Sequence, residues 1–206
     1  MYEALKRIFD LLAALIGVVF LSPLMAATAV AIKLDSEGPV LYLGKRVGLH
    51  GKEFSIFKFR TMCVGAETFG TTTAAGDARI TRVGRFTRKY KLDELPQLFN
   101  VIKGEMSLVG PRPEVKEHTD DYDEEEKLIL SVIPGITDYS SIRFVRLNDI
   151  LGSENPHELF LTKYRTEKNQ LRLQYVRNRS LREDLKILAL TFLALARAAT
   201  GRLEPK

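Results

Sequence analysis

Hydrophobic residues are most concentrated near the N-terminus, where the chain carries no charged residue from Leu11 to Ile32. A run of roughly 20 apolar residues is long enough to cross a bilayer as a helix. Ser22-Pro23 stands at the middle of this run. Proline lacks the N–H that continues the helical hydrogen-bond ladder, and its ring collides with the preceding turn, so we expect a sharp bend there. The Ser22 hydroxyl can satisfy the backbone group that the proline leaves free.

Basic residues flank the run on both sides. Lys6 and Arg7 precede it, and those that follow it are Lys33, Lys45, Arg46, Lys52, Lys58 and Arg60. Because positive flanks favour the cytoplasmic side of a membrane, the pattern favours a re-entrant helix broken at Ser22-Pro23. Each arm would rise about 16 Å, about half of the hydrocarbon thickness. A single spanning helix, and a secretory signal with an A-x-A cleavage site at Ala27–Ala29, remain alternatives.

The rest of the chain predicts an α+β fold that is mostly helical. Alternating apolar residues in Val40–Leu43 and Phe54–Phe59, separated by glycine-rich segments, predict a short β-hairpin. Helices are predicted over Leu92–Ile102 (with Asp93 at or beside its start and Gly104 as its stop), Val115–Val132, Glu158–Arg177 and Arg182–Ala199, and loops over Val64–Asp77 and Ser107–Glu114. Without a repeat or a linker, the sequence indicates a membrane segment over residues 1–37 and one further domain over residues 38–206.

Two segments allow a functional and a structural interpretation. The acidic run Asp120–Glu126 could bind a metal or a partner, but a solvated helix surface is the more common role of such a run. The helix predicted over Arg182–Ala199 is strongly apolar yet short for a membrane span. We therefore expect it to pack on the domain or to lie along the membrane interface.

Composition narrows the chemistry. The net charge of +5 indicates anionic partners such as phosphates, acidic lipid or nucleic acid. The single cysteine, Cys63, excludes a disulfide framework and a thiolate zinc site. His50, His118 and His157 lack metal-ligand spacing, which argues against a zinc hydrolase.

The candidate chemistry lies between Arg79 and Glu94, where a strongly basic stretch runs directly into Asp93 and Glu94. A nucleic-acid surface seldom places acids inside its basic stretch, because they repel phosphate. A site that binds and cuts a pyrophosphate needs both charges: cations for the phosphate oxygens, and a carboxylate that attacks phosphorus or holds Mg²⁺. A plain helix cap is the alternative role for Asp93.

Arg112 is the second candidate for binding phosphate. Pro111 and Pro113 fix the backbone on both sides of it, which would hold its guanidinium in place. The chain contains neither G-x-x-x-x-G-K-[ST] nor G-x-G-x-x-G, so nucleotide binding by those glycine-rich loops is not supported.

These residues belong to a series of motifs by which the chain resembles the bacterial sugar transferases, specifically the small monotopic phosphoglycosyl transferases. The motifs cover nearly the whole chain, in this order: K-R-x-F-D-L at Lys6–Leu11, Ser22-Pro23, I-K-x-x-S-x-G-P-V at Ile32–Val40, R-x-G at Arg46–Gly48, K-F-R-T-M at Lys58–Met62, R-I-T-R-V-G-R at Arg79–Arg85, L-D-E-L-P-Q-L at Leu92–Leu98, S-L-V-G-P-R-P-E at Ser107–Glu114, P-G-I-T at Pro134–Thr137, and Y-V-x-N-x-S-L-x-x-D-L-K-I at Tyr175–Ile187.

The resemblance implies a reaction. Asp93 would attack the β-phosphorus of a UDP-sugar bound with Mg²⁺, release UMP and form a phosphosugar-aspartyl intermediate. Undecaprenyl phosphate would then take the phosphosugar, in the first membrane step of a surface glycan or glycoprotein pathway. Asp93 would also be a metal ligand, and Glu94 would assist catalysis. The resemblance further implies that substrate is bound by Lys58, Arg60, Thr81, Arg85, Arg88, Pro111, Arg112, Pro113 and Glu114. Arg143 and Arg146 lie in a segment that departs from the family pattern, and we expect them to supply further cations to the substrate.

The resemblance also implies a location. The protein would lie in the bacterial inner membrane on its cytoplasmic face, with Lys6, Arg7, Ser22 and Pro23 belonging to a re-entrant membrane helix and interfacial helices on residues 38–206. The partners would be the two substrates and the bilayer, with no nucleic acid. The sequence leaves open whether the chain forms a homo-oligomer.

One region departs from many larger relatives of this family, which carry G-x-x-Q-V-x-G-R after P-G-I-T. Here the corresponding segment, Asp138–Asn148, reads DYSSIRFVRLN. The identity of the sugar therefore cannot be inherited from the resemblance. A membrane-tethered basic scaffold for nucleic acid or acidic lipid is the alternative function, and an inactive relative is a third, against which the intact Asp93-Glu94 pair argues.

Overall fold

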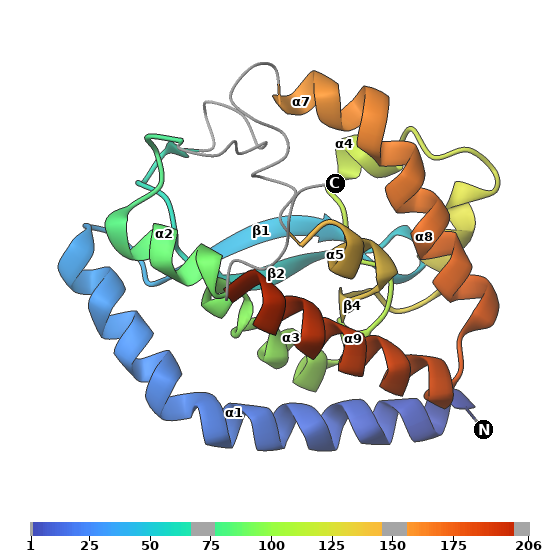
Figure 1. Cartoon of the computed structure of the whole chain (residues 1–206), viewed down its shortest axis with the longest axis horizontal. Coiled ribbons are helices and arrows are strands. Elements are labelled where there is room, and N and C mark those ends of the chain that lie inside the picture. The colour runs from blue at the N-terminus through green and yellow to red at the C-terminus, as the bar shows by residue number, and fades with distance from the viewer. Residues whose placement is uncertain (1, 67–76, 146–155, 200–206) are drawn as a thin grey trace.

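A computed structural model of the chain describes residues 2–66, 77–145 and 156–199. Its elements are, in chain order, α1 (Tyr2–Asp35), β1 (Leu41–Val47), η1 (Leu49–Gly51), β2 (Glu53–Phe59), α2 (Arg82–Lys89), η3 (Leu92–Glu94), α3 (Gln97–Lys103), β3 (Ser107–Val109), α4 (Lys116–Thr119), η4 (Glu126–Ser131), β4 (Gly135–Thr137), α5 (Tyr139–Arg143), α7 (Pro156–Leu159), η5 (Phe160–Tyr164, a π-helical segment), α8 (Arg165–Asn178) and α9 (Leu181–Ala199). Helices surround two small sheets, and the long α1 follows one side of the domain (Figure 1). The fold is α+β, as predicted.

Helix α1 is bent near its middle but is not broken (Figure 1). It continues through Pro23 to Asp35, so the break expected at Ser22-Pro23 is not seen. The missing N–H of Pro23 leaves the carbonyl of Val19 without its usual helical donor. The Ser22 hydroxyl donates to that carbonyl over 2.8 Å, as expected, and this bond compensates for the proline.

The first turns of α1 are fixed to the domain by buried charges. Lys6 Nζ donates to Asp184 Oδ2 of α9 over 2.9 Å, and Tyr2 donates to the same oxygen over 3.0 Å. One turn later, Asp10 accepts from the Ser107 hydroxyl over 2.7 Å. These polar residues are buried because their partners lie in the domain, so Lys6 is more than a flank of the apolar run.

The second basic residue of the flank, Arg7, is also engaged. Its guanidinium donates to the carbonyls of Val101 over 2.6 Å and Ile102 over 2.9 Å at the end of α3. Carbonyls at the end of a helix lack intrahelical donors, so Arg7 supplies them. Gly104 then ends α3 with φ of 84°, which confirms the predicted stop.

The last turn of α1 is held by the same domain. Arg60 donates to the carbonyl of Ser36 over 2.8 Å and to that of Glu37. The Asp35 carboxylate accepts from the backbone N–H of Val83 in α2 over 2.8 Å. Both ends of α1 are therefore bound to one domain.

The middle of α1 presents apolar side chains outward. Phe20 is 80% exposed and Val19 is 70% exposed. Among the helices that the structure describes, α1 is the one long and apolar enough to cross a membrane. The opposite face packs inward, where Ala14 joins Ile56, Val101 and Met106 in a buried cluster.

The predicted hairpin is confirmed. Strands β1 and β2 pair antiparallel, with Leu41 opposite Phe59 and Val47 opposite Glu53. A second, parallel pair joins β3 to β4, and β3 lies at the start of the segment Ser107–Glu114 that was predicted to be a loop. The two strands approach so closely that a Cβ on Gly135 would collide with the backbone of Gly110, which explains glycine at both positions.

The single helix predicted over Val115–Val132 is wrong. The segment forms the short α4, a turn, and then η4. The Asp123 carboxylate accepts the backbone N–H groups of Glu125 (2.9 Å) and Glu126 (2.7 Å), so this side chain starts a new turn instead of continuing a helix. Most of the acidic run is exposed, as expected, although it lies on a turn and buries Tyr122.

The remaining helices follow the predictions with local changes. The helix predicted over Leu92–Ile102 divides into η3 and α3. The helix predicted over Glu158–Arg177 forms α7, η5 and α8. The last predicted helix is confirmed as α9, whose Ile187 packs with Val109 and Tyr175 in a second buried cluster. Most of the predicted loop Val64–Asp77 lies outside the described residues.

The docking of α1 predicts that Asp184→Ala destabilises the fold. Removing one partner of a buried charge pair typically costs about 3–5 kcal/mol, because Lys6 would stay buried with only Asp10, 3.9 Å away, as its counter-charge. The measurement is thermal unfolding of the purified protein in detergent. Glu3→Ala is the control, since Glu3 pairs with Arg179 between exposed side chains and should cost about 1 kcal/mol or less. Equal losses in the two variants would contradict this account.

Candidate functional site

Asp93 and Glu94 lie on a tight turn between α2 and α3. Lys91 adopts the left-handed conformation, with φ of 57°, and the 3₁₀ turn η3 follows it directly. The N–H of Lys91 donates to the carbonyl of Arg88 over 3.2 Å, and the N–H of Glu94 donates to the carbonyl of Lys91 over 3.3 Å. A non-glycine residue at positive φ is uncommon and is found where the surrounding structure requires it. Here it sets the direction in which the two carboxylates point.

Both carboxylates line a cavity of about 370 Å³. The walls are formed by the hairpin strands, the segment after β2, and the end of α2. The cavity is rich in cations, which are Arg46, Lys58, Arg60, Arg88 and Lys91. Such a concave, basic site with two acids is suited to a ligand that carries several negative charges.

Asp93 is buried and poorly paired. Its side chain belongs to a residue only 7% exposed, and Oδ1 has no hydrogen-bond partner among the residues that the structure describes. Burial raises the pKa of the Asp93 carboxyl, and the negative charge of Glu94 raises it further. An unpartnered buried carboxylate at a cavity wall is the feature expected of a reactive group.

Glu94 has the opposite environment. Its carboxylate accepts from Arg112 and from Lys58, the latter over 3.3 Å. Burial alone would raise the pKa of Glu94, but the charges of Arg112 and Lys58 outweigh it and hold that pKa well below the usual range. The pKa of Asp93 is therefore raised, while the pKa of the adjacent Glu94 is lowered.

Arg112 is fixed from several directions. Its Nη1 donates to the carbonyl of Ile136 over 2.9 Å, and its backbone N–H donates to Asp138 Oδ2 over 3.2 Å. The carbonyl of Pro111 accepts from the N–H of Gly135 over 3.0 Å, so the proline-bounded loop is bound to β4. The guanidinium therefore reaches Glu94 from a rigid support.

Glu114, at the end of this loop, points into a buried ionic cluster and not into the cavity. It accepts from Arg172, from Lys168 over 3.4 Å, and contacts His118 Nδ1 at 3.4 Å. Burial would raise the pKa of Glu114, but Arg172 and Lys168 lower it well below the usual range. The structure thus places Glu114 as an anchor between the loop and α8.

The other residues expected to bind substrate are spread over several places. Lys58, Arg60 and Arg88 line the cavity. Arg60 donates to the Ser36 carbonyl at the end of α1, and Arg88 Nε donates to the Thr61 hydroxyl over 2.8 Å. The roles of these side chains toward substrate stay predictions.

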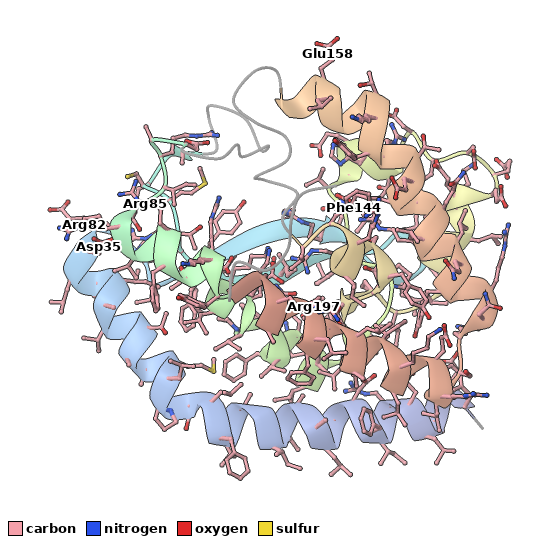
Figure 2. All side chains as sticks on the ribbon, in the orientation of Figure 1. Asp35, Arg82, Arg85, Phe144, Glu158 and Arg197 are labelled. Carbon is pink, nitrogen blue, oxygen red and sulfur yellow. The ribbon has the colours of Figure 1, made fainter. Side chains whose placement is uncertain are left out.

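Three further candidates lie away from the cavity, and one is not described. Thr81 caps α2 by accepting from the N–H of Gly84 over 2.9 Å. Arg85 lies near Asp35, where α2 meets the end of α1 (Figure 2). Arg143 pairs with Glu167 over 3.2 Å. Arg146 lies outside the described residues.

Sequence reasoning did not single out three groups that the structure places at or behind the site. Arg46 and Lys91 line the cavity, and Arg172 holds Glu114. Arg46 stands in the R-x-G motif and Lys91 in the basic stretch, so both could have been considered. Lys168 and Arg172 are four residues apart on one helix face, which is a weak signal because solvated helices show the same spacing.

The site fits Mg²⁺ only together with a substrate. Among the described residues there is no cluster of three histidine, cysteine or acidic side chains that could hold a metal by itself. Mg²⁺ commonly binds one or two carboxylates and completes its octahedral shell with substrate phosphates and water. The unpartnered Oδ1 of Asp93 is an oxygen ligand of the kind this requires.

Comparison with known proteins places the chain in a family. A family model described as "Bacterial sugar transferase" matches residues 1–198. The UDP-N-acetylgalactosamine-undecaprenyl-phosphate N-acetylgalactosaminephosphotransferase of Aeromonas hydrophila is 49% identical over 145 residues, covering 68% of this chain and 34% of that protein. The UDP-glucose:undecaprenyl-phosphate glucose-1-phosphate transferase of Xanthomonas campestris pv. campestris is 43% identical over 195 residues, covering 90% of this chain and 37% of that protein.

The relatives differ in length. The chain spans about a third of the two transferases just named, but 85% of the uncharacterized sugar transferase EpsL of Bacillus subtilis (strain 168), to which it is 38% identical over 187 residues. The matched region contains the cavity, both carboxylates and the proline-bounded loop. The chain belongs to the bacterial sugar transferase family.

Proposed function

We propose that this protein transfers a sugar phosphate from a UDP-sugar to undecaprenyl phosphate and releases UMP. The names of its relatives support the two substrates. The observation that carries the proposal is that two adjacent carboxylates in a basic cavity differ in their partners. Asp93 is buried with an oxygen that has no hydrogen-bond partner among the described residues, whereas Glu94 is paired with Arg112. A diphosphate supplies the negative charge that this cavity lacks.

In the proposed reaction Asp93 is the nucleophile. A carboxylate oxygen of Asp93 forms a bond to the β-phosphorus, and the bond from that phosphorus to the bridging oxygen breaks. The bridging oxygen leaves with its electron pair on UMP. A phosphate oxygen of the lipid then attacks the same phosphorus, releases the Asp93 carboxylate and forms an undecaprenyl-diphosphate sugar, the first membrane-bound product of a surface glycan or glycoprotein pathway.

The other residues support this step without forming covalent bonds to substrate. Glu94 holds Arg112 beside the site, while Lys58, Arg88 and Lys91 provide positive charge around Asp93. When bound, Mg²⁺ would supply further positive charge to the phosphates, with Asp93 as its protein ligand. These cations favour the ionised form of Asp93 that attack requires.

We further propose that α1 enters the cytoplasmic face of the inner membrane and returns to the same side. The binding of both ends of α1 to one domain supports this topology, because a spanning helix would carry its two ends to opposite sides of the bilayer. The exposed apolar middle around Val19 and Phe20 supports contact with lipid. The bend at the proline shortens the depth that α1 must reach.

Asp93→Asn is expected to abolish turnover, because an amide does not attack phosphorus effectively. With a UDP-sugar and Mg²⁺ but no lipid acceptor, the wild-type protein should release up to one equivalent of UMP and keep a labelled phosphosugar on Asp93 that hydroxylamine removes. The matched control is Asp77→Asn, which removes a carboxylate outside the cavity. UMP release only in the presence of acceptor would contradict the covalent step and leave the transfer itself standing.

The two carboxylates are also expected to affect stability in opposite directions. Because burial raises the pKa of Asp93, its ionised form costs stability at neutral pH, so Asp93→Asn should raise the melting temperature at pH 7. Glu94→Gln should cost about 3–5 kcal/mol, since Arg112 and Lys58 lose their counter-charge.

The pH dependence checks the sign of both effects. Asp93→Asn should lose its advantage as pH falls below the ordinary range of a carboxyl, where Asp93 is protonated in both the folded and the unfolded chain. The pKa of Glu94 is depressed, so its contribution is present above the ordinary range and is lost only as pH falls toward that depressed value. Melting curves from about pH 8 down to about pH 2 follow both effects. A lower melting temperature for Asp93→Asn at pH 7 would contradict the account of its burial.

The topology is testable with single cysteines at Glu3 and Lys45 in a Cys63→Ser background. Both positions are exposed and lie on opposite sides of the apolar segment, so neither probe disturbs the buried contacts of α1. Both should resist an impermeant thiol reagent in intact cells and react after permeabilisation. Labelling of the Glu3 probe alone in intact cells would establish a spanning helix.

A further inference from the structure

The face of the hairpin that looks into the cavity carries a cation that the proposed reaction does not yet use. Tyr42, Gly44 and Arg46 alternate along β1, so they share one face of it. Tyr42 is directly opposite Lys58 on β2. Tyr42, Arg46 and Lys58 all line the cavity that contains Asp93 and Glu94. The hairpin therefore presents two cations and an aromatic ring to the same space.

Gly44 is the feature that brings Tyr42 and Arg46 together. A Cβ at this position would lie 2.8 Å from Tyr42 Cε1 and 3.2 Å from Arg46 Nη1. Both side chains thus fold over the bare backbone of Gly44, and any side chain there would displace them. The strand is shaped to hold the guanidinium of Arg46 in one place.

Arg46 is a cation without an ion-pair partner among the residues that the structure describes. Its Nη1 donates to the carbonyl of Lys45 over 2.6 Å. Burial lowers the pKa of the Arg46 guanidinium and the charge of Glu114 partly offsets this effect, and an arginine stays charged at neutral pH. By contrast, Lys58 and Arg112 already share the carboxylate of Glu94.

The position of Arg46 separates it from the reacting end of the cavity. The backbone N–H of Val47 donates to the carbonyl of Glu114 over 2.9 Å, so this end of β1 lies against the loop that carries Arg112. Arg46 is opposite Phe54 in the hairpin, four positions along β2 from Lys58, whose side chain contacts Glu94. This offset along the strands favours an anion that lies beside the group that Asp93 attacks over that group itself.

We propose that Arg46 binds the α-phosphate of the nucleoside diphosphate, the phosphate that leaves with UMP. This inference rests on the proposed function, in which Asp93 takes the β-phosphorus. A guanidinium forms two parallel hydrogen bonds to a phosphate, so it both orients the leaving group and neutralises the charge that develops on it. Gly44 and Tyr42 fix that guanidinium before substrate arrives.

The experiment measures binding of UMP to the purified protein by calorimetry, with no lipid or sugar present. Arg46→Gln should raise the Kd of UMP about 10- to 100-fold, the usual effect of losing a charge-assisted contact to phosphate. Lys45→Gln is the matched control, since it removes the same charge from the adjacent residue, which is 79% exposed on the other face of the strand. Equal effects in the two variants, or an unchanged Kd in Arg46→Gln, would overturn the inference.

Uridine separates the phosphate from the rest of the nucleotide. If Arg46 contacts the phosphate, Arg46→Gln should leave the Kd of uridine, measured by saturation-transfer NMR, within twofold of the wild-type value. If Arg46→Gln weakens the binding of uridine by the same factor as the binding of UMP, the assignment is overturned, because the side chain would then act on the nucleoside or on the fold.

A second variant keeps the charge and moves it. Gly44→Ala retains Arg46, and alanine is accepted in a strand at least as well as glycine, but its Cβ must displace Tyr42 and Arg46. This variant should weaken UMP binding with little loss of thermal stability. Wild-type affinity in Gly44→Ala would count against a pre-positioned guanidinium.

The outcomes distinguish this inference from the transferase proposal. UMP release from a UDP-sugar, combined with UMP binding that does not depend on Arg46, leaves the transferase standing and overturns the inference. UMP binding that depends on Arg46, in a protein that transfers none of the UDP-sugars tested, supports the phosphate site and contradicts the transferase proposal.

Discussion

The ion pair between Glu94 and Arg112 is the contact on which the arrangement of the site depends. It joins the turn that carries both carboxylates to a loop that is far away in sequence. That loop is in turn bound to β4, to the cap of α5 through Asp138, and to α8 through Glu114. A buried ion pair contributes little net stability, because desolvation offsets most of the attraction. Its value here is geometric, since it fixes the orientation of the turn and leaves Asp93 unpaired.

Buried polar contacts also fix the position of α1. Its apolar middle can be satisfied by lipid, but its buried Lys6 and Asp10 can be satisfied only by the domain. Each end is held through both side-chain carboxylates and backbone carbonyls. Because neither end can leave the domain without breaking buried polar contacts, α1 and the cavity form one structural unit.

Local patterns predicted the elements better than they predicted the partners of charged side chains. The hairpin and α9 follow from apolar alternation and helical period, and the Asp93-Glu94 pair stands out because acids follow a basic stretch. The helix expected over Val115–Val132 fails because a carboxylate can start a new turn as readily as it can face solvent. The turn accompanies the burial of Tyr122, and burial is not visible in the sequence.

The partners of the arginines are the hardest to predict from the sequence. Arg60 and Arg112 both stand in motifs that the family resemblance associates with substrate. Arg60 donates to the carbonyls that follow α1, and Arg112 donates to the Glu94 carboxylate beside the cavity. A guanidinium binds carbonyls, carboxylates and phosphates with the same donors, so residue type alone does not select among them. Only the fold decides, by placing a helix end next to one and an acid next to the other.

The contrast between the two carboxylates explains why a stable fold can contain a reactive group. Hydrogen bonds that stabilise a carboxylate also lower its reactivity, because its lone pairs are already used. Glu94 takes the arginine and the lysine that would otherwise pair with Asp93, and so it keeps the site folded. Asp93 is left buried with a free oxygen and a raised pKa, which is unfavourable for stability. The nearby charges of Lys58, Lys91 and Arg88 reduce this cost, because they favour the ionised form of Asp93.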